Sequence, residues 1–216
     1  MKVFASWSGG KESALATYKA ILQGYQVSYL VNFISEDGER SRSHGIKAEV
    51  LNLQAKAIGI PLVQVRTSWE DYEENFKRVV TELKQKGIEG GVFGDIDLEE
   101  HREWVERVCA ELEIEPLLPL WGIKPGDLLA DFGKGGFKAM VVATRLQESL
   151  LGRSLDETFL DEIRRLNSHP CGESGEYHTF VFDGPIFQRP LKVISGKKEK
   201  RDSVWFLEIA AELGQR

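Results

Sequence analysis

Short apolar runs alternate with amphipathic segments through the first 120 residues, and this alternation constrains the fold more than any other feature of the sequence. The apolar runs, rich in β-branched and aromatic residues, cover residues 3–7, 27–34, 62–65, 90–96 and 116–121. Between them, apolar residues recur at helical spacing over residues 14–22, 46–58, 72–83 and 104–112. Strands and helices that alternate with short connections form a parallel sheet with helices on both faces. We therefore predict an α/β fold with a mostly parallel five-stranded sheet.

The pattern changes after residue 120. The sequence there predicts a short helix near 128–132, a strand, a charged helix and further strands, at 137–144, 155–166, 177–187, 191–194 and 203–209. A charged run at 197–201 separates the last two strands, and we expect it to be mobile. This half is predicted to form a smaller α+β lobe packed on the first. The predicted domains are residues 1–120 and residues 121–216.

Composition narrows the class of protein. The 216 residues include 28 basic and 34 acidic side chains, a formal net charge of −6, which argues against broad electrostatic binding to nucleic acid. No apolar run approaches the roughly 20 residues that span a bilayer, and the first residues show no signal-peptide pattern. The two cysteines, Cys109 and Cys171, form no CxxC motif. We predict a reduced, cytoplasmic protein without membrane contact, for which a homodimer stays open.

The connection after the first predicted strand has the composition of an anion-binding loop. It leads directly into the first helix and consists of Ser8, Gly9, Gly10, Lys11, Glu12 and Ser13. The glycines allow backbone N–H groups to turn inward, and a helix start offers unpaired N–H groups and the positive end of the helix dipole. A Gly-Gly pair alone is more often only a tight turn. The flanking serines and lysine, which can donate to phosphate oxygens, favour a phosphate site here.

Two further turns are expected at the same edge of the sheet, because ligands of parallel sheets bind beyond the carboxyl ends of the strands. The second and fourth predicted strands end at Phe33 and at Gly94-Asp95. Asp95 is a candidate contact for a metal ion or a ribose; alternatively, it caps the following helix. Arg40 and Arg42 are either solvated or phosphate ligands.

Three further side chains have weaker functional patterns. His101 and His169 lack metal-ligand spacing, and we interpret both as structural. Cys171 lacks a paired base in the sequence around it, so a passive thiol is favoured over a nucleophile.

Residues 8–13 resemble the SGGxDS pyrophosphate loop of the N-type ATP pyrophosphatases, with Glu12 in place of the usual aspartate. Members of that family transfer AMP to a carbonyl or a carboxylate and release pyrophosphate. The resemblance implies that ATP is a cofactor bound by the loop, with Phe33, Gly94 and Asp95 as further contacts at the rim. It also implies Mg²⁺, for which Glu12 and Asp95 are the candidate ligands.

A second segment combines glycines with two carboxylates. Glu173 and Glu176 could hold Mg²⁺, bind an amine or ammonium group, or position a nucleophile; alternatively, the segment is a solvated turn. Residues 173–181, followed by Asp183, Pro185 and Phe187, resemble the EGGEYETFV…D.P.F signature of the diphthine–ammonia ligase family. Residues 93–96, 120–122 and 151–152 also stand in family-like places, so the resemblance covers nearly the full chain. Ser174 and His178 depart from the signature.

The resemblance implies an ATP-dependent amidation in which a carboxylate, diphthine on elongation factor 2, is adenylated and then attacked by ammonia. It implies catalytic roles for Lys11, Glu173 and Glu176. It also implies substrate contacts beside the two glutamates, at Gly175, Tyr177 and Thr179. His44 stands where members of the family often carry a histidine, which suggests a phosphate or substrate contact rather than a surface position.

Other functions stay open at this point. The same chemistry could act on a small carboxylate, for example in corrinoid or other cofactor salvage, because residues 41–45 differ from the aromatic-rich pattern of archaeal and eukaryotic relatives. A tRNA-thiolating enzyme would need catalytic cysteines and a basic surface, and a nucleotide sensor would release no pyrophosphate. We expect Gly10→Val to abolish ATP binding with the fold intact. Glu176→Gln should keep ATP binding and lose amidation.

Overall fold

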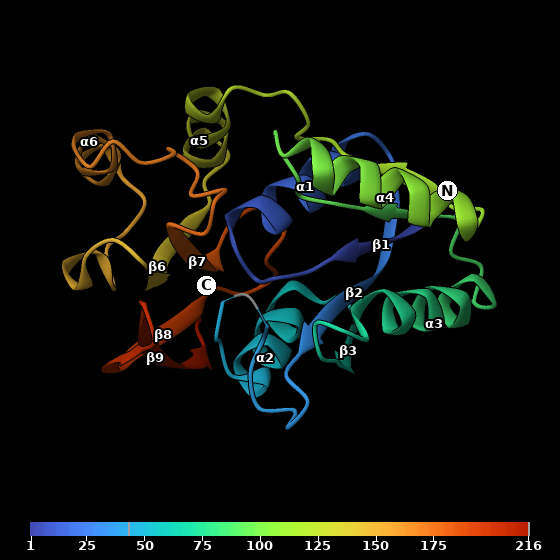
Figure 1. Ribbon diagram of the computed structural model, residues 1–216, viewed down its shortest axis with the longest axis horizontal. Coiled ribbons are helices and arrows are strands. Elements are labelled where there is room, and N and C mark those ends of the chain that lie inside the picture. Colours follow the sequence, from blue (N-terminus) through green and yellow to red (C-terminus); the bar gives the residue numbers. More distant parts are fainter. Residues whose placement is uncertain (43, 216) are drawn as a thin grey trace.

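Five parallel strands form the sheet of the N-terminal half, as predicted. The computed structural model describes residues 1–42 and 44–215, and its sheet has the order β3–β2–β1–β4–β5 (Figure 1). The strands are β1 (Lys2–Ser6), β2 (Gln26–Ile34), β3 (Leu62–Arg66), β4 (Gly90–Val92) and β5 (Glu115–Leu117). Every neighbouring pair is parallel. β1 lies between β2 and β4, so the loops that follow these three strands meet at one edge, where such sheets bind ligands.

Four helices cover the two faces of this sheet. They are α1 (Lys11–Leu22), α2 (Ala48–Ile58), α3 (Tyr72–Lys84) and α4 (Glu99–Glu111). Successive residues of β1 point to opposite faces: Val3 and Ala5 join the apolar cluster that includes α1 and α2, whereas Phe4 joins the cluster that includes α3 and α4. Burial on both faces explains why the strand sequences are apolar without alternation.

The C-terminal half forms the predicted smaller α+β part. Its four-stranded antiparallel sheet has the order β7–β6–β9–β8 and lies beside the parallel sheet in Figure 1. The elements are α5 (Pro125–Lys134), β6 (Lys138–Thr144), the short 3₁₀ helix η1 (Glu148–Leu150), α6 (Glu157–Arg165), β7 (Tyr177–Asp183), β8 (Leu191–Arg201) and β9 (Val204–Leu213). None of the helices within the described residues is long and apolar enough to cross a bilayer.

One expectation for this half is wrong. The charged run 197–201 is not a mobile connection but the end of β8, which pairs with β9 up to Arg201 and Val204. Strand pairing uses backbone groups, so exposed charged side chains do not prevent it. The cationic side chains also contact β9: Lys200 lies 5.2 Å from the Trp205 ring and Arg201 lies 4.9 Å from the Phe206 ring.

The two halves share one apolar core. The cluster that contains Leu15 of α1 and Leu51 of α2 continues into Val141 of β6 and Phe180 of β7. β7 also contacts the glycine loop directly, because the Val181 amide donates to the Gly9 carbonyl at 2.9 Å. The division into domains of residues 1–120 and 121–216 stays a prediction. The shared core bears on it, because apolar residues of the two halves pack against one another.

Candidate active site

Three cavities meet at the carboxyl end of β1, and Ser6 lines all of them. The first, the β2 cavity, is lined by Ser6, Trp7, Ser8, Val31, Asn32, Phe33, Ser41, Arg42, His44, Trp69 and Tyr72. The second, the loop cavity, is lined by Ser6, Ser8, Lys11, Glu12, Ser13, His44, Gly94, Asp95, His101, Cys171, Gly172, Glu173, Tyr177 and His178. The third, the aromatic cavity, is lined by Ser6, Trp69, Tyr72, Phe93, Asp95, His101, Trp104 and Val105. Ser43, in the segment 41–45, lies outside the described residues.

The glycine loop opens backbone donors toward the loop cavity. α1 begins at Lys11, directly after Gly10. The Lys11 amide donates to Thr179 Oγ1 at 3.0 Å, whereas the amides of Glu12 and Ser13 have no hydrogen-bond partner within the described residues. Ser13 Oγ lies 3.2 Å from Ser8 Oγ. Unpaired first-turn amides at the positive end of a helix dipole, with two hydroxyls beside them, fit a phosphate group.

The glycines of the loop are also required by packing. A Cβ atom on Gly10 would lie 2.5 Å from His44 Cε1 and 3.2 Å from the Thr179 carbonyl oxygen. At Gly9, where φ is +81°, a Cβ atom would lie 2.5 Å from Leu51 Cδ2. The expectation that Gly10→Val leaves the fold intact stays a prediction, and these contacts count against it, because a valine side chain would meet a buried histidine and the backbone of β7.

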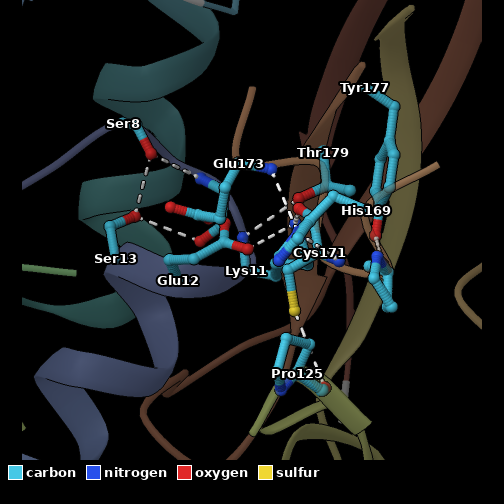
Figure 2. A network of polar contacts seen from close by, with 12 residues as sticks. Ser8, Lys11, Glu12, Ser13, Pro125, His169, Cys171, Glu173, Tyr177 and Thr179 are labelled. Atoms are coloured by element: carbon cyan, nitrogen blue, oxygen red, sulfur yellow. Dashed lines mark hydrogen bonds and ion pairs between the residues drawn. The ribbon is translucent and has the colours of Figure 1, made fainter. Parts of the chain in front are cut away.

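Lys11 is buried at the floor of the loop cavity. Its Nζ donates to the Cys171 carbonyl at 2.6 Å, forms an ion pair with Glu12, and lies 4.6 Å from the Tyr177 ring centroid (Figure 2). Burial is the largest single influence on the pKa of this ammonium group and acts to lower it, but Glu12, Tyr177 and Cys171 together hold the pKa above its ordinary value. Lys11 therefore stays charged and joins the glycine loop to the segment before β7.

Glu173 faces this charge from the C-terminal half. Burial, followed by the nearby carboxylate of Glu12, raises its pKa to about 8, while Lys11 acts in the opposite direction. The carboxyl group is therefore largely protonated at neutral pH. It can donate a hydrogen bond to an anion in the cavity, and it can accept a proton once it has lost its own.

Asp95 and His101 form a hydrogen-bonded pair at the end of β4. Asp95 Oδ1 lies 3.2 Å from His101 Nδ1, and both residues line the loop and aromatic cavities. Asp95 does not cap α4, whose N-cap is Leu98 without a side-chain bond. The sequence analysis interpreted His101 as a structural residue and did not predict its position on the first turn of α4. That turn faces the same edge of the sheet as the glycine loop. Asp95 raises the pKa of His101 chiefly through this hydrogen bond.

The arrangement of the carboxylates around the loop cavity can be compared with the ligands that Mg²⁺ requires. Within residues 1–42 and 44–215, no group of three or more histidine, cysteine, aspartate or glutamate side chains is arranged to hold a metal ion. Glu12 and Asp95 nevertheless line the same cavity as the unpaired amides. Mg²⁺ is commonly held by one or two carboxylates together with phosphate oxygens and water. The residues therefore fit Mg²⁺ only as part of a complex with bound phosphates.

His44 lies between the β2 and loop cavities but cannot act as a cation there. Its Nδ1 lies 3.0 Å from the Thr179 carbonyl, and its ring lies 4.6 Å from that of His178. Burial first, and then the neighbouring His178, lower the pKa of His44 well below its ordinary value. Since a carbonyl can only accept, Nδ1 carries the proton and Nε2 is an acceptor. The suggested phosphate contact would require a donor, so an N–H or O–H group of a ligand is the better partner.

The other residues predicted to bind substrate do not all line the cavities. Tyr177 lines the loop cavity, but its hydroxyl donates to the Pro170 carbonyl at 2.5 Å. Thr179 is fully buried against the glycine loop, and Gly175 and Glu176 lie outside the three cavities. Glu176 Oε1 accepts from the His169 amide at 3.2 Å.

His169 and Cys171 order the segment that carries Glu173. His169 Nε2 lies 3.2 Å from Asp97 Oδ2, and its Nδ1 accepts from the amides of Cys171 and Glu173 at 3.2 and 3.4 Å. Cys171 Sγ lies 3.7 Å from the Pro125 carbonyl, and burial raises the pKa of the thiol to about 12. The thiol is therefore protonated at neutral pH, as a passive role requires. Figure 2 shows both residues beside Lys11.

The sequence analysis missed the aromatic walls of the site. Trp69, Tyr72 and Trp104 come from the segment before α3, from the start of α3 and from α4. Tyr72 had been predicted only as part of the apolar stripe of its helix. Trp69 is 68% exposed, and the Arg42 guanidinium lies 4.3 Å from its ring centroid. A tryptophan in an otherwise polar connection is the one signal in the sequence that could have indicated this wall.

Comparisons with known proteins found matches over most of the chain. Residues 1–116 match the family model for the diphthamide synthase N-terminal domain, and residues 124–212 match that for the diphthamide synthase C-terminal domain. The chain is 30% identical to the human diphthine–ammonia ligase, over 91% of this chain and 84% of the human protein. It is 27% identical to the rat diphthine–ammonia ligase, over 89% and 83%, and 29% identical to that of Schizosaccharomyces pombe, over 98% of this chain and 39% of the yeast protein.

Proposed function

The chain belongs to the diphthamide synthase family, and on that premise we propose that it is an ATP-dependent ligase that adenylates a carboxylate and transfers the acyl group to ammonia. We further propose diphthine on elongation factor 2 as the carboxylate. The observation that supports this function best is the floor of the loop cavity. There the permanent charge of Lys11 and the unpaired amides of Glu12 and Ser13 face the protonated carboxyl group of Glu173.

Binding of ATP follows from the charges of the cavities. Among the described residues, the lining of the β2 cavity has no acidic side chain and contains Arg42 and the Asn32 amide, so it suits the nucleoside and the α-phosphate. The loop cavity takes the β- and γ-phosphates on the amides of Glu12 and Ser13, with Lys11 adding charge. Glu12 and Asp95 would hold Mg²⁺ together with phosphate oxygens, and Mg²⁺ when bound neutralises the charge of the departing pyrophosphate.

The substrate carboxylate would lie beside Glu173. One of its oxygens attacks the α-phosphorus of ATP, the bond from that phosphorus to the pyrophosphate breaks, and an acyl adenylate forms. While protonated, Glu173 can accommodate the incoming anion without charge repulsion. Lys11 and the loop amides stabilise the charge that develops on the pyrophosphate. The chain thereby converts a poor electrophile into one with a good leaving group.

Ammonia then attacks the acyl carbon of the adenylate. A C–N bond forms, the nitrogen loses a proton, and the C–O bond to AMP breaks to leave the amide. The deprotonated form of Glu173, which a pKa of about 8 makes accessible near neutral pH, can accept that proton. Burial of the reacting groups between the two halves holds the acyl adenylate against the nucleophile and limits hydrolysis.

The test is to incubate the full chain with ATP, Mg²⁺, ammonium and elongation factor 2 carrying diphthine, and to follow the nucleotide and the protein product. We expect AMP and pyrophosphate in step with the amide. ADP as the nucleotide product would contradict adenylation. A second series of reactions replaces the protein substrate with small carboxylates. If AMP formed only in that series, the substrate would be a small metabolite and not elongation factor 2.

Glu173→Gln and Glu176→Gln form a matched pair. Glu173→Gln should lower amide formation by about 100-fold, the scale of one acid–base group, while ATP binding persists. Glu176 lies outside the loop cavity, so its substitution should have a much smaller effect. If only Glu176→Gln abolished amidation, Glu176, which the sequence analysis predicted to be catalytic together with Glu173, would replace Glu173 in the mechanism.

A further inference from the structure

One histidine ring is the acceptor for two backbone donors of the segment that carries Glu173 (Figure 2). His169 Nδ1 accepts from the Cys171 amide at 3.2 Å and from the Glu173 amide at 3.4 Å. Neither amide has another hydrogen-bond partner within the described residues. Cys171 is 1% exposed, and a buried amide without an acceptor costs free energy. The turn from residue 169 to residue 173 therefore depends on this ring for its shape.

The opposite ring nitrogen holds the turn against the N-terminal half. His169 Nε2 lies 3.2 Å from Asp97 Oδ2. Asp97 follows Ile96, which is fully buried and whose carbonyl accepts from the Gly122 amide at 2.9 Å, so the carboxylate comes from a fixed segment. Because amides can only donate, Nδ1 carries no proton. The proton of the neutral ring is then on Nε2 and is donated to Asp97, so one tautomer satisfies all three contacts.

The Glu173 carboxyl group has no such support of its own. It lines the loop cavity, and within residues 1–42 and 44–215 it has neither a hydrogen bond nor an ion pair. The neighbouring Cys171 carbonyl is fixed, because it accepts from Lys11 Nζ at 2.6 Å. The position of the carboxyl group therefore follows from its backbone, which His169 holds at the amide.

We propose that His169 is a positioning residue for amidation, which holds Glu173 in the loop cavity through the acceptor Nδ1 while Asp97 fixes the tautomer. His169 is absent from the linings of the three cavities, so it acts through Glu173 and not on the substrate. A displacement of about 1 Å can cost about 100-fold in rate. The role of Glu173 rests on the proposed function, whereas its placement by His169 can be measured without turnover.

Asparagine and glutamine separate the roles of the two ring nitrogens. The oxygen of an asparagine side chain takes the place of Nδ1, whereas the end of a glutamine side chain takes the place of Nε2. We expect His169→Asn to keep kcat for amide formation within about 3-fold of the wild type, and His169→Gln to lower it at least about 10-fold. The KM for ATP should change less than about 2-fold in both variants.

Amide hydrogen exchange, followed by NMR on the full chain, measures the same contacts directly. The Cys171 and Glu173 amides should exchange at least about 10-fold faster in His169→Gln than in the wild type or in His169→Asn. Thermal unfolding shows whether each variant keeps the fold. Asp97→Ala leaves the ring in place and is the second variant: it should speed exchange of the same two amides, because the tautomer is no longer fixed.

A double variant decides whether His169 acts through Glu173. His169→Gln combined with Glu173→Gln should be no slower than Glu173→Gln alone, because the carboxyl group that His169 positions is already absent. A double variant slower by the product of the two single effects would show independent action and overturn the inference. Equal exchange rates in all the variants, or equal losses of kcat in His169→Asn and His169→Gln, would also overturn it.

AMP formation separates failure of this inference from failure of the proposed function. Normal formation of AMP and amide by His169→Gln would reject the positioning role and leave the ligase standing. If the wild type formed no AMP with any carboxylate, the ligase would be rejected. The exchange rates would then decide by themselves whether His169 holds the Glu173 segment in place.

Discussion

Gly10 lies at the point where His44 and β7 come closest to the start of α1. Its φ of −92° is accessible to any residue, so the requirement for glycine is one of space. We expect Gly10→Ala to destabilise the fold by about 1–3 kcal/mol, because the added Cβ would lie 2.5 Å from buried His44. Thermal or denaturant unfolding measures this change.

Gly126, in α5, provides the matched control. A Cβ there meets no atom within 4 Å, and alanine is the better helix former, so Gly126→Ala should stabilise the fold by about 0.5–1 kcal/mol. Equal effects of the two substitutions would show that the close approach of His44 to the loop is not a constraint.

Glu173 predicts a dependence of stability on pH. Its pKa is about 8 in the folded chain, against an ordinary value of 4.5, so the folded state retains a proton that the unfolded chain has released. The stabilisation this provides is complete below about pH 4.5 and is lost as the pH rises through 8. Glu173→Gln cannot lose a proton there. The melting temperature of the variant relative to the wild type should therefore increase from pH 5 to pH 9, measured with EDTA present.

A titration of Glu173 by carbon NMR gives the independent check. A midpoint near 4.5 would contradict both the stability prediction and the proton transfer assigned to this residue. Agreement of the two measurements would tie the stability change to this one carboxyl group.

At the scale of elements, one side chain of α2 contacts the residue after β1, the glycine loop and β7. Gln54 is fully buried; its Nε2 donates to the carbonyls of Gly9 at 3.0 Å and Val181 at 2.6 Å, and its Oε1 accepts from Trp7 Nε1 at 2.9 Å. Gln54→Leu would leave these buried groups unpaired. We expect a loss of about 1–3 kcal/mol and weaker ATP binding, measured by unfolding and by nucleotide titration. Lys56→Gln, on the exposed side of the same helix, should change neither.

An element could be predicted from the sequence when its own residues carried the hydrophobic pattern. The apolar runs and helical stripes of the first half predict β1 to β5 and the four helices, because each carries its own periodicity. The charged run 197–201 carries no such signal and becomes a strand only because β9 pairs with it. The glycine loop and Asp95 were found for the same local reason, since both follow predicted strands. The aromatic cavity was not, because it exists only where α3 and α4 pack beside β4.

At the scale of the whole molecule, the proposed active site lies across the two halves rather than within one. Lys11 of α1 donates to the Cys171 carbonyl, Val181 of β7 donates to the Gly9 carbonyl, and a single apolar cluster contains residues of both halves. The loop cavity correspondingly needs Glu12 from one half and Glu173 from the other. The contacts that join the two halves therefore also form the proposed site.

This arrangement predicts that the chain unfolds as one unit, although the sequence pattern suggested domains of residues 1–120 and 121–216. A half on its own would expose the apolar faces of α1 and α2 that β6 and β7 cover, and it would leave the buried charge of Lys11 without the Cys171 carbonyl. Scanning calorimetry of the full chain should give one transition, with calorimetric and van't Hoff enthalpies equal. Saturating ATP should move that transition as a whole, by about 2.7 kcal/mol at 100 times the dissociation constant. Two transitions, of which ATP moved only one, would instead show that the halves are independent domains and that the glycine loop binds nucleotide without the C-terminal half.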